Sequence, residues 1–401
     1  KADALNVPHD RRRAQLIRGE AITTDDGRTI RPEDVVADSI PGPVVLVIDC
    51  PSEEYLDGLT ANDELKSYMS PKTDASQTGA NEKVSCVIHL APARILRHPI
   101  YIEWKKDYPA ATTHIAPAGF SSSVATAFLS ASRVNARLNC INEMVFPLQG
   151  TVEPEDLPST YLRGENTLKF QLRPIASLGV DSSTVPVKVD VNTVQQEVLD
   201  SFKQQELEND VPECSLKVCS EEMELVFLGT GAAQPSKYRN VTSLYTHFFD
   251  KGGFLLDVGE DTCGQLFRRF GQESKEILQN LQLIWISHIH ADHHAGLFPL
   301  LRRRRAWLLE NSGSCPTLKV VGPRPLARVL QAYEKFEPLA VEFIDCSEFR
   351  NDNEPSSGAS KLDPVLERLG LHTLQCVPVL HCPHAYGIVF EHKKVCIKFA
   401  R

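Results

Sequence analysis

Residues 287–296 read SHIHADHHAG and directly follow the run LQLIWI at 281–286. That run is short and almost wholly apolar, which is typical of a strand buried inside a sheet. The histidines therefore lie on a loop that leaves the end of a buried strand. After Asp292 the apolar residues are spaced as in a helix, so Asp292 and His293 lie near a helix start.

This loop carries three imidazoles and one carboxylate within six positions, at His288, His290, Asp292 and His293. Such nitrogen and oxygen ligands suit zinc or a similar divalent ion, manganese included. Alternate side chains of an extended loop diverge, so the first two histidines can serve one ion and the Asp-His pair a second. The alternative is a histidine-rich surface loop. A buried strand directly before the loop favours metal binding.

The composition is that of an ordinary globular chain. Its 401 residues allow two or three domains, and 42% of them are hydrophobic. No apolar run reaches the roughly 18 residues of a membrane-spanning helix. The formal charge of -9 argues against a protein that coats nucleic acid through its net charge. The eleven cysteines include no Cys-x-x-Cys pair and indicate a reducing, intracellular compartment.

The N-terminal half is predicted to be α/β. Its apolar runs at 44–48 and 84–90 indicate strands, and the spacing over 124–140 indicates a helix. His89 and His114 are isolated from other ligands in sequence and are predicted to be structural. Two arginine clusters, at 11–13 and 302–305, are predicted to be solvated helix faces, with phosphate contact as the alternative.

A further domain is predicted to start at Glu224. Asp257 ends one of its strands, where it either orients a metal-binding histidine or caps a turn. His381 directly follows another strand and is the candidate third ligand of the ion held by His288 and His290. The other expected elements are strands at 225–229, 241–249, 254–258, 318–323 and 373–380, a hairpin turn at 250–253, a helix at 326–336 and a polar loop at 347–364.

The spacing His-x-His-x-Asp-His resembles the motif of the metallo-β-lactamase superfamily. Four further stretches, FLGTG at 227–231, PSKYRN at 235–240, LDVGE at 256–260 and HCPHAYG at 381–387, narrow the resemblance to ribonuclease Z. This endonuclease removes 3′ trailers from precursor tRNA. The N-terminal half, with DCPS at 49–52 and VIHLAP at 87–92, is similar to the amino half of the long, eukaryotic form, a degenerate copy of the catalytic fold.

The resemblance implies an α/β protein built on the αββα metallo-β-lactamase sandwich. Residues 1–177 would be part of a degenerate metallo-β-lactamase-like domain. Residues 178–222 would form a linker with an exposed helix, expected at 193–210. Residues 223–401 would be the N-terminal part of the catalytic domain. The family is intracellular, in the nucleus or the mitochondrion, has no membrane segment, and its long form is expected to be monomeric.

The resemblance also implies a site. His288, His290 and His381 would hold one Zn²⁺, and Asp292 and His293 a second, with Mn²⁺ as an alternative metal. Asp292 and Asp257 would be the catalytic carboxylates, Asp257 acting from behind the ligands. A water between the ions would attack the phosphodiester of precursor tRNA. Lys237, Arg239 and Asn240 would face the RNA.

The chain departs from the family in two respects. Asp261 stands where the family usually has glycine, and the family's later Gly-Asp-Thr/Ser and His-Glu motifs do not follow His381. With Lys1 as first residue, the chain is expected to be cut at both ends. Two alternatives remain open: an inactive homologue that still binds RNA, and another hydrolase of the superfamily that acts on a thioester or lactam.

Overall fold

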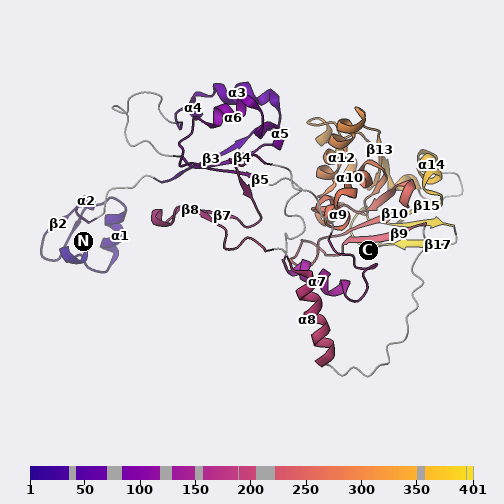
Figure 1. Cartoon of the computed structure of the whole chain (residues 1–401), viewed down its shortest axis with the longest axis horizontal. Coiled ribbons are helices and arrows are strands. Elements are labelled where there is room, and N and C mark those ends of the chain that lie inside the picture. Colours follow the sequence, from indigo (N-terminus) through magenta and orange to yellow (C-terminus); the bar gives the residue numbers. More distant parts are fainter. Residues whose placement is uncertain are drawn as a thin grey trace. The chain divides into compact units, whose positions relative to one another are not determined.

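The computed structural model describes residues 1–35, 42–69, 84–117, 129–149, 157–187, 189–204, 222–349, 357–393 and 395–400. Contacts divide the chain into two compact units (Figure 1). Unit 1 comprises Lys1–Pro117, Leu157–Gly164 and Lys169–Asp181, and unit 2 comprises Ala118–Asp156, Glu165–Leu168 and Ser182–Arg401. In the described part of the chain, no helix is both long enough and apolar enough to cross a membrane.

Unit 2 is built around a six-stranded sheet with the strand order β14-β13-β12-β11-β10-β9. Strands β11 to β14 run parallel, and β10 is antiparallel to both of its neighbours. The central strands are apolar on both faces because both faces are covered. The strands are β9 Glu224–Gly229, β10 Ser243–His247, β11 Gly253–Leu256, β12 Leu281–Trp285, β13 Leu318–Gly322 and β14 Val341–Asp345.

Helices cover one face of this sheet. Their apolar residues, such as Leu266, Leu300 and Leu326, share one core with Ile284 and Val320 of the sheet. In the three longer helices the apolar residues recur at three- and four-residue intervals, so one stripe of each faces the sheet. The helices are α9 Thr262–Phe270, α10 Ser274–Gln279, α12 Leu297–Ser312 and α13 Arg324–Glu334.

A second, antiparallel sheet packs on the other face. It consists of β15 Leu371–Pro378, β16 Tyr386–His392 and β17 Val395–Phe399. The ring of Phe254 meets that of Phe390 edge to face at 5.1 Å, in a core that both sheets share. Two sheets with helices on the outer face form the expected metallo-β-lactamase sandwich.

Unit 1 is a smaller α/β assembly, as predicted. Its parallel sheet has the order β3-β4-β5-β6, with β3 Val44–Asp49, β4 Val84–Leu90, β5 Thr113–Pro117 and β6 Leu162–Gly164. Helices α3 Leu56–Ala61, α5 Ala93–Leu96 and α6 Pro99–Lys105 supply its core, which is rich in aromatic rings. A separate small cluster joins α1 Arg11–Ile17, α2 Pro32–Val35 and the hairpin β1 Ile22–Thr23 and β2 Thr29–Ile30.

His89 and His114 are structural in the sense predicted, but they are not isolated in space. His89 is fully buried, its Nδ1 lies 2.7 Å from the Tyr101 hydroxyl, and its Nε2 lies 2.9 Å from His114 Nδ1. Parallel pairing of Val87 with His114 brings the two rings together. Burial lowers the pKa of His89 to about 3 and that of His114 to about 4, so both imidazoles are neutral at pH 7.

Two expected segments differ from the prediction. The prediction of a polar loop at 347–364 is wrong from residue 357 on, where α14 Ser357–Leu369 begins and buries Leu362, Val365 and Leu369 in the core between the sheets. Positions 350–356 of the predicted loop lie outside the described residues. Pro364 lies inside that helix. The buried guanidinium of Arg304 donates to the Pro316 carbonyl at 3.0 Å, so the 302–305 cluster is not wholly a solvated face.

The predicted linker helix is present as α8 Val191–Gln204. It is not exposed on all sides, because Val194 is buried and Glu197 lies 3.6 Å from Arg137 of α7 Leu129–Asn139. The expected positions 205–210 of this helix lie outside the described residues. The two compact units do not follow the predicted domain boundaries at 177 and 222, which stay a prediction.

Candidate metal centre

The first two histidines of the loop after β12 face each other. His288 is 2% exposed and His290 is exposed, and His288 Nε2 lies 3.0 Å from His290 Nδ1. The loop continues into the short helix α11 Ala291–His294, with His290 directly before it. Backbone bonds from Val258 N to His293 O at 2.7 Å and from Gly296 N to Val258 O at 3.0 Å fix this turn beside the end of β11.

His381 approaches the same point from the second sheet. Its ring centroid lies 4.6 Å from that of His288 and 5.2 Å from that of His290. The loop after β15 is tied to the first sheet, because Tyr386 N donates to Ser287 O at 3.0 Å. With Cys382, these histidines offer four possible ligand atoms that all lie within 4.8 Å of one another.

Asp292 and His293 form a second pair beside the first. His293 Nε2 lies 3.5 Å from Asp292 Oδ2, and the rings of His293 and His288 are 4.0 Å apart. Asp292 Oδ2 also accepts from Ala233 N at 2.8 Å. Although partial burial raises the pKa of Asp292, that hydrogen bond and the neighbouring His293 outweigh it and lower the pKa. This carboxyl is therefore ionised at pH 7, as a metal ligand must be.

Asp257 lies behind the histidines and is fully buried. Its Oδ2 lies 2.6 Å from His293 Nδ1 and accepts from the Ser287 hydroxyl at 2.9 Å, while its Oδ1 accepts from Ser287 N at 2.8 Å. A carboxylate only accepts, so His293 Nδ1 carries the proton and Nε2 offers its lone pair. These contacts are those of a residue that orients a ligand rather than of a turn cap.

The same argument assigns the tautomer of His288. The single proton of the Ser287 hydroxyl goes to Asp257, so Oγ accepts from His288 Nδ1, which lies 2.9 Å away. His288 Nε2 is left with a lone pair towards the cluster. Burial, helped by the neighbouring imidazoles, lowers the pKa of His288 to about 4, and the ring is neutral at pH 7. Neutral imidazole is the form that binds metal.

The donor set fits a divalent ion such as zinc. Zinc bonds of about 2.0–2.1 Å to nitrogen and 2.3 Å to sulfur place tetrahedral ligand atoms roughly 3.3–3.6 Å apart. The spacings of 3.0 Å at His288 and His290 and of 3.5 Å at Asp292 and His293 lie close to that range. Small side-chain movements would close each group on an ion.

The loop 235–240 lies beside this centre, as Ala233 is bonded to Asp292. Lys237, Tyr238 and Arg239 are exposed, and Lys237 Nζ lies 5.0 Å above the Tyr238 ring. Asn240 differs from them, because it is only 8% exposed and its amide donates to Glu260 O at 2.6 Å. Asn240 thus holds the base of the loop rather than presenting its side chain outward.

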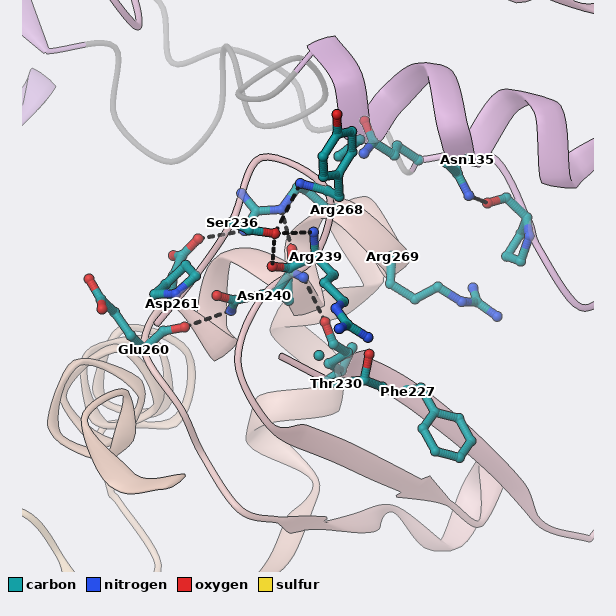
Figure 2. Close-up of a pocket in the computed structure, with 18 residues that line it drawn as sticks. Asn135, Phe227, Thr230, Ser236, Arg239, Asn240, Glu260, Asp261, Arg268 and Arg269 are labelled. Atoms are coloured by element: carbon teal, nitrogen blue, oxygen red, sulfur yellow. Dashed lines mark hydrogen bonds and ion pairs between the residues drawn. The ribbon is translucent and has the colours of Figure 1, made fainter. Parts of the chain in front are cut away.

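A pocket of about 490 Å³ opens on the side of this loop, between α9, β9 and the segment that carries α7. Figure 2 shows Arg239, Arg268 and Arg269 around it, with the Phe227 ring at one end. Arg268 forms an ion pair with Asp261 at 2.5 Å. The guanidinium thus balances the charge of the carboxylate that stands where the family usually has glycine. Arg269 pairs with Glu224 at 3.3 Å, whereas Arg239 has no ion pair within the described residues.

Two residues of the centre were not predicted from the sequence, Ser287 and Cys382. Each stands next to a predicted ligand, and that adjacency is the signal that could have identified it. The structure brings together every predicted ligand, His288, His290, Asp292, His293 and His381, with Asp257 behind them.

The fold and this cluster define a protein of the metallo-β-lactamase fold. The structure is similar to the crystal structure of a long form RNase Z from yeast, with a TM-score of 0.59 and 18% identity over 87% of this chain and 55% of that one. In sequence, "tRNAse Z TRZ4, mitochondrial" of Arabidopsis thaliana is 35% identical over 475 residues, covering 97% of this chain and 50% of that protein. Over most of its length the chain is homologous to proteins named tRNase Z or ribonuclease Z.

Two further comparisons match all or part of the chain. "Zinc phosphodiesterase ELAC protein 2" of Mus musculus is 31% identical over 394 residues, which is 93% of this chain and 45% of that protein. The family model described as "Anti-Pycsar protein Apyc1" matches residues 223–308. The chain spans about half the length of the curated relatives it matches.

Proposed function

We propose that this chain carries the metal centre of a zinc-dependent endoribonuclease that removes the 3′ trailer from precursor tRNA. The observation that carries the proposal is the meeting of His288 and His290, from the loop after β12, with His381, from the loop after β15. The names of the relatives, tRNAse Z and zinc phosphodiesterase, support the substrate and the ion.

The proposed roles follow from the contacts. His288, His290 and His381 would hold one divalent ion, and Asp292 and His293 a second. Ions bound there would supply Lewis-acid chemistry and an activated water for phosphodiester hydrolysis. Asp257 and Ser287 hold the protons of His293 and His288 at Nδ1, so both rings keep Nε2 free for binding.

The loop 235–240 is the proposed contact for RNA. Lys237 and Arg239 are exposed cations suited to phosphate, and the Tyr238 ring is 57% exposed and able to stack on a base. The pocket beside it adds the Phe227 ring, which is 64% exposed. Asn240, which was predicted to face RNA, would instead shape the loop through its bond to Glu260.

We also propose mitochondria as a place of action. Two Arabidopsis thaliana relatives, TRZ4 and TRZ3, carry the word mitochondrial in their names and support this location.

The direct test is cleavage of a precursor tRNA that carries a labelled 5′ end and a 3′ trailer. We expect one product, cut at the trailer junction, in the presence of zinc. The variant His290→Ala should abolish cleavage, because the ring is proposed to bind the metal ion. Its affinity for RNA should stay within about twofold of the unaltered chain, because the proposed RNA contact is the loop 235–240. Cleavage of a thioester or lactam instead of the RNA would contradict the proposal.

A second measurement addresses the RNA contact alone. Arg239→Glu should weaken binding of the precursor tRNA and reduce the slope of log affinity against log salt by about one. Lys335→Glu reverses a charge at an exposed position after α13 and is the matched control. Equal loss of affinity in the two variants would mean that the RNA does not contact Arg239 specifically. Tight binding without any cut would make the chain an RNA-binding homologue.

A further inference from the structure

Cys382 lies directly after His381, in the loop between β15 and β16. The sulfur is partly buried, and it lies with His288, His290 and His381 in the group whose ligand atoms are all within 4.8 Å of one another. Three imidazole nitrogens and one sulfur make a complete tetrahedral set for a first-row divalent ion. The sulfur therefore lies within reach of an ion that the three histidines would hold.

The backbone around Cys382 is held in place. Its carbonyl accepts from Ala385 N at 3.2 Å, and Val379 N donates to Ala385 O at 3.1 Å, so residues 379–385 form a closed turn. Tyr386 N then bonds to Ser287 O at 3.0 Å, next to His288. These bonds fix the loop that carries His381 and Cys382 against the loop that carries the other two histidines. Little ordering would be needed on binding.

We propose that Cys382 is the fourth protein ligand of the ion held by His288, His290 and His381, an inference that rests on the proposed metal centre. As a thiolate it would give a site of three nitrogens and one sulfur. Such a ligand prefers zinc to manganese, because manganese favours carboxylate, carbonyl and water ligands.

Four protein ligands close a zinc site, whereas catalytic sites keep one position for water or substrate. With Cys382 bound, the resting centre resembles a closed site. The second pair, Asp292 and His293, lies beside this ion and offers no sulfur.

Cobalt substitution tests the proposal without reference to activity. The probe is Co²⁺ titrated into the metal-free full chain, read by its absorption spectrum. A thiolate ligand should produce a sulfur-to-cobalt charge-transfer band in the near ultraviolet, with one equivalent bound. Cys382→Ser should lose that band and bind zinc at least about tenfold more weakly, a loss on the scale of removing a supporting group. Cys396→Ser, at an exposed position of β17, should keep both.

The outcomes separate this inference from the proposed function. Cobalt binding without the band, or a band that persists in Cys382→Ser, overturns the role of Cys382 and leaves the histidine centre standing. No cobalt binding overturns both. If Cys382→Ser does not fold, alkylation of the unaltered chain tests the same role. Zinc should protect Cys382 from alkylation, read by peptide mass spectrometry, and equal labelling with and without zinc would overturn the proposal.

Discussion

Asp257 and His293 form a buried pair in which the carboxylate Oδ2 lies 2.6 Å from the ring Nδ1. The pair joins the end of β11 to the metal-binding loop after β12. Because the carboxylate holds the ring proton at Nδ1, the opposite nitrogen keeps a lone pair that is free to bind an ion. The carboxylate also orients the backbone of Ser287. One side chain thus organises both halves of the centre.

Asp257→Asn is expected to weaken zinc binding by about 10–100-fold, the usual cost of losing a partner behind the ligands. The amide keeps the size of the side chain, and asparagine tolerates the positive φ of 58° at this position. Competition with a fluorescent chelator measures the affinity. Asp250→Asn, at an exposed turn, is the control. Equal zinc affinity in both variants would rule out the orienting role.

Two substitutions of Asp292 should separate its charge from its contact with Ala233. Asp292→Asn keeps an oxygen for the Ala233 amide but loses the charge, so zinc per chain should fall while the melting temperature of the metal-free chain stays unchanged. Asp292→Ala should lower both, since the bond at 2.8 Å is lost. Elemental analysis and thermal unfolding give the two readings. Unchanged zinc content in Asp292→Asn would show that the ion does not need this carboxylate.

Gly296→Ala should displace the metal-binding loop. An added Cβ would lie 2.1 Å from the Gly259 carbonyl oxygen, so two backbones would have to move apart. We expect a loss of about 3 kcal/mol or more in the free energy of unfolding of unit 2, together with weaker zinc binding. Gly58→Ala is the control, because its Cβ meets nothing within 4 Å and it lies in helix α3. A variant as stable as the control would contradict the close approach.

The buried His89 should make unit 1 sensitive to acid. Its pKa in the fold is about 3, below the ordinary 6.5, so the unfolded chain takes up a proton that the folded unit refuses. Stability is complete above about pH 6.5 and falls by about 1.4 kcal/mol per pH unit as the pH drops towards 3. Hydrogen exchange of β4 and β5, corrected for the intrinsic rate, measures the free energy of opening at each pH.

His89→Gln tests that assignment. The amide can still bond to Tyr101 but does not titrate, so the acid sensitivity of β4 and β5 should decrease. His9→Gln, at an exposed histidine, should leave the wild-type dependence in place. A steep loss of stability in His89→Gln between pH 6.5 and 4 would assign the effect to other groups, His114 first among them.

The convergence of the predicted ligands could be expected from the sequence, because each follows a short apolar strand. The run at 281–286 is β12 almost to the residue, and the run before His381 is β15. The loops that follow two strands leave from the ends of those strands. Where the two sheets of a sandwich place these ends side by side, residues on the two loops can converge. The family resemblance predicted that the loop 235–240 faces RNA, and the structure adds that it lies next to the centre.

The rest required tertiary structure. Nothing in the sequence indicates that the Ser287 hydroxyl donates a hydrogen bond to Asp257, 30 positions earlier in the chain. Cys382 looked like a neighbour of a ligand, since only the turn over 379–385 brings its sulfur to the histidines. The helix α14 was missed because Pro364 argues against a helix interior, although Leu362, Val365 and Leu369 keep helical spacing.

The bond from Tyr386 N to Ser287 O has a consequence for folding. His288 and His381 stand about 90 positions apart, so the predicted ligand set is complete only when the second sheet is docked on the first. An ion that binds the docked form and not the open one pulls that docking equilibrium forward by mass action. Metal supply would then decide how much of the chain reaches its native sandwich.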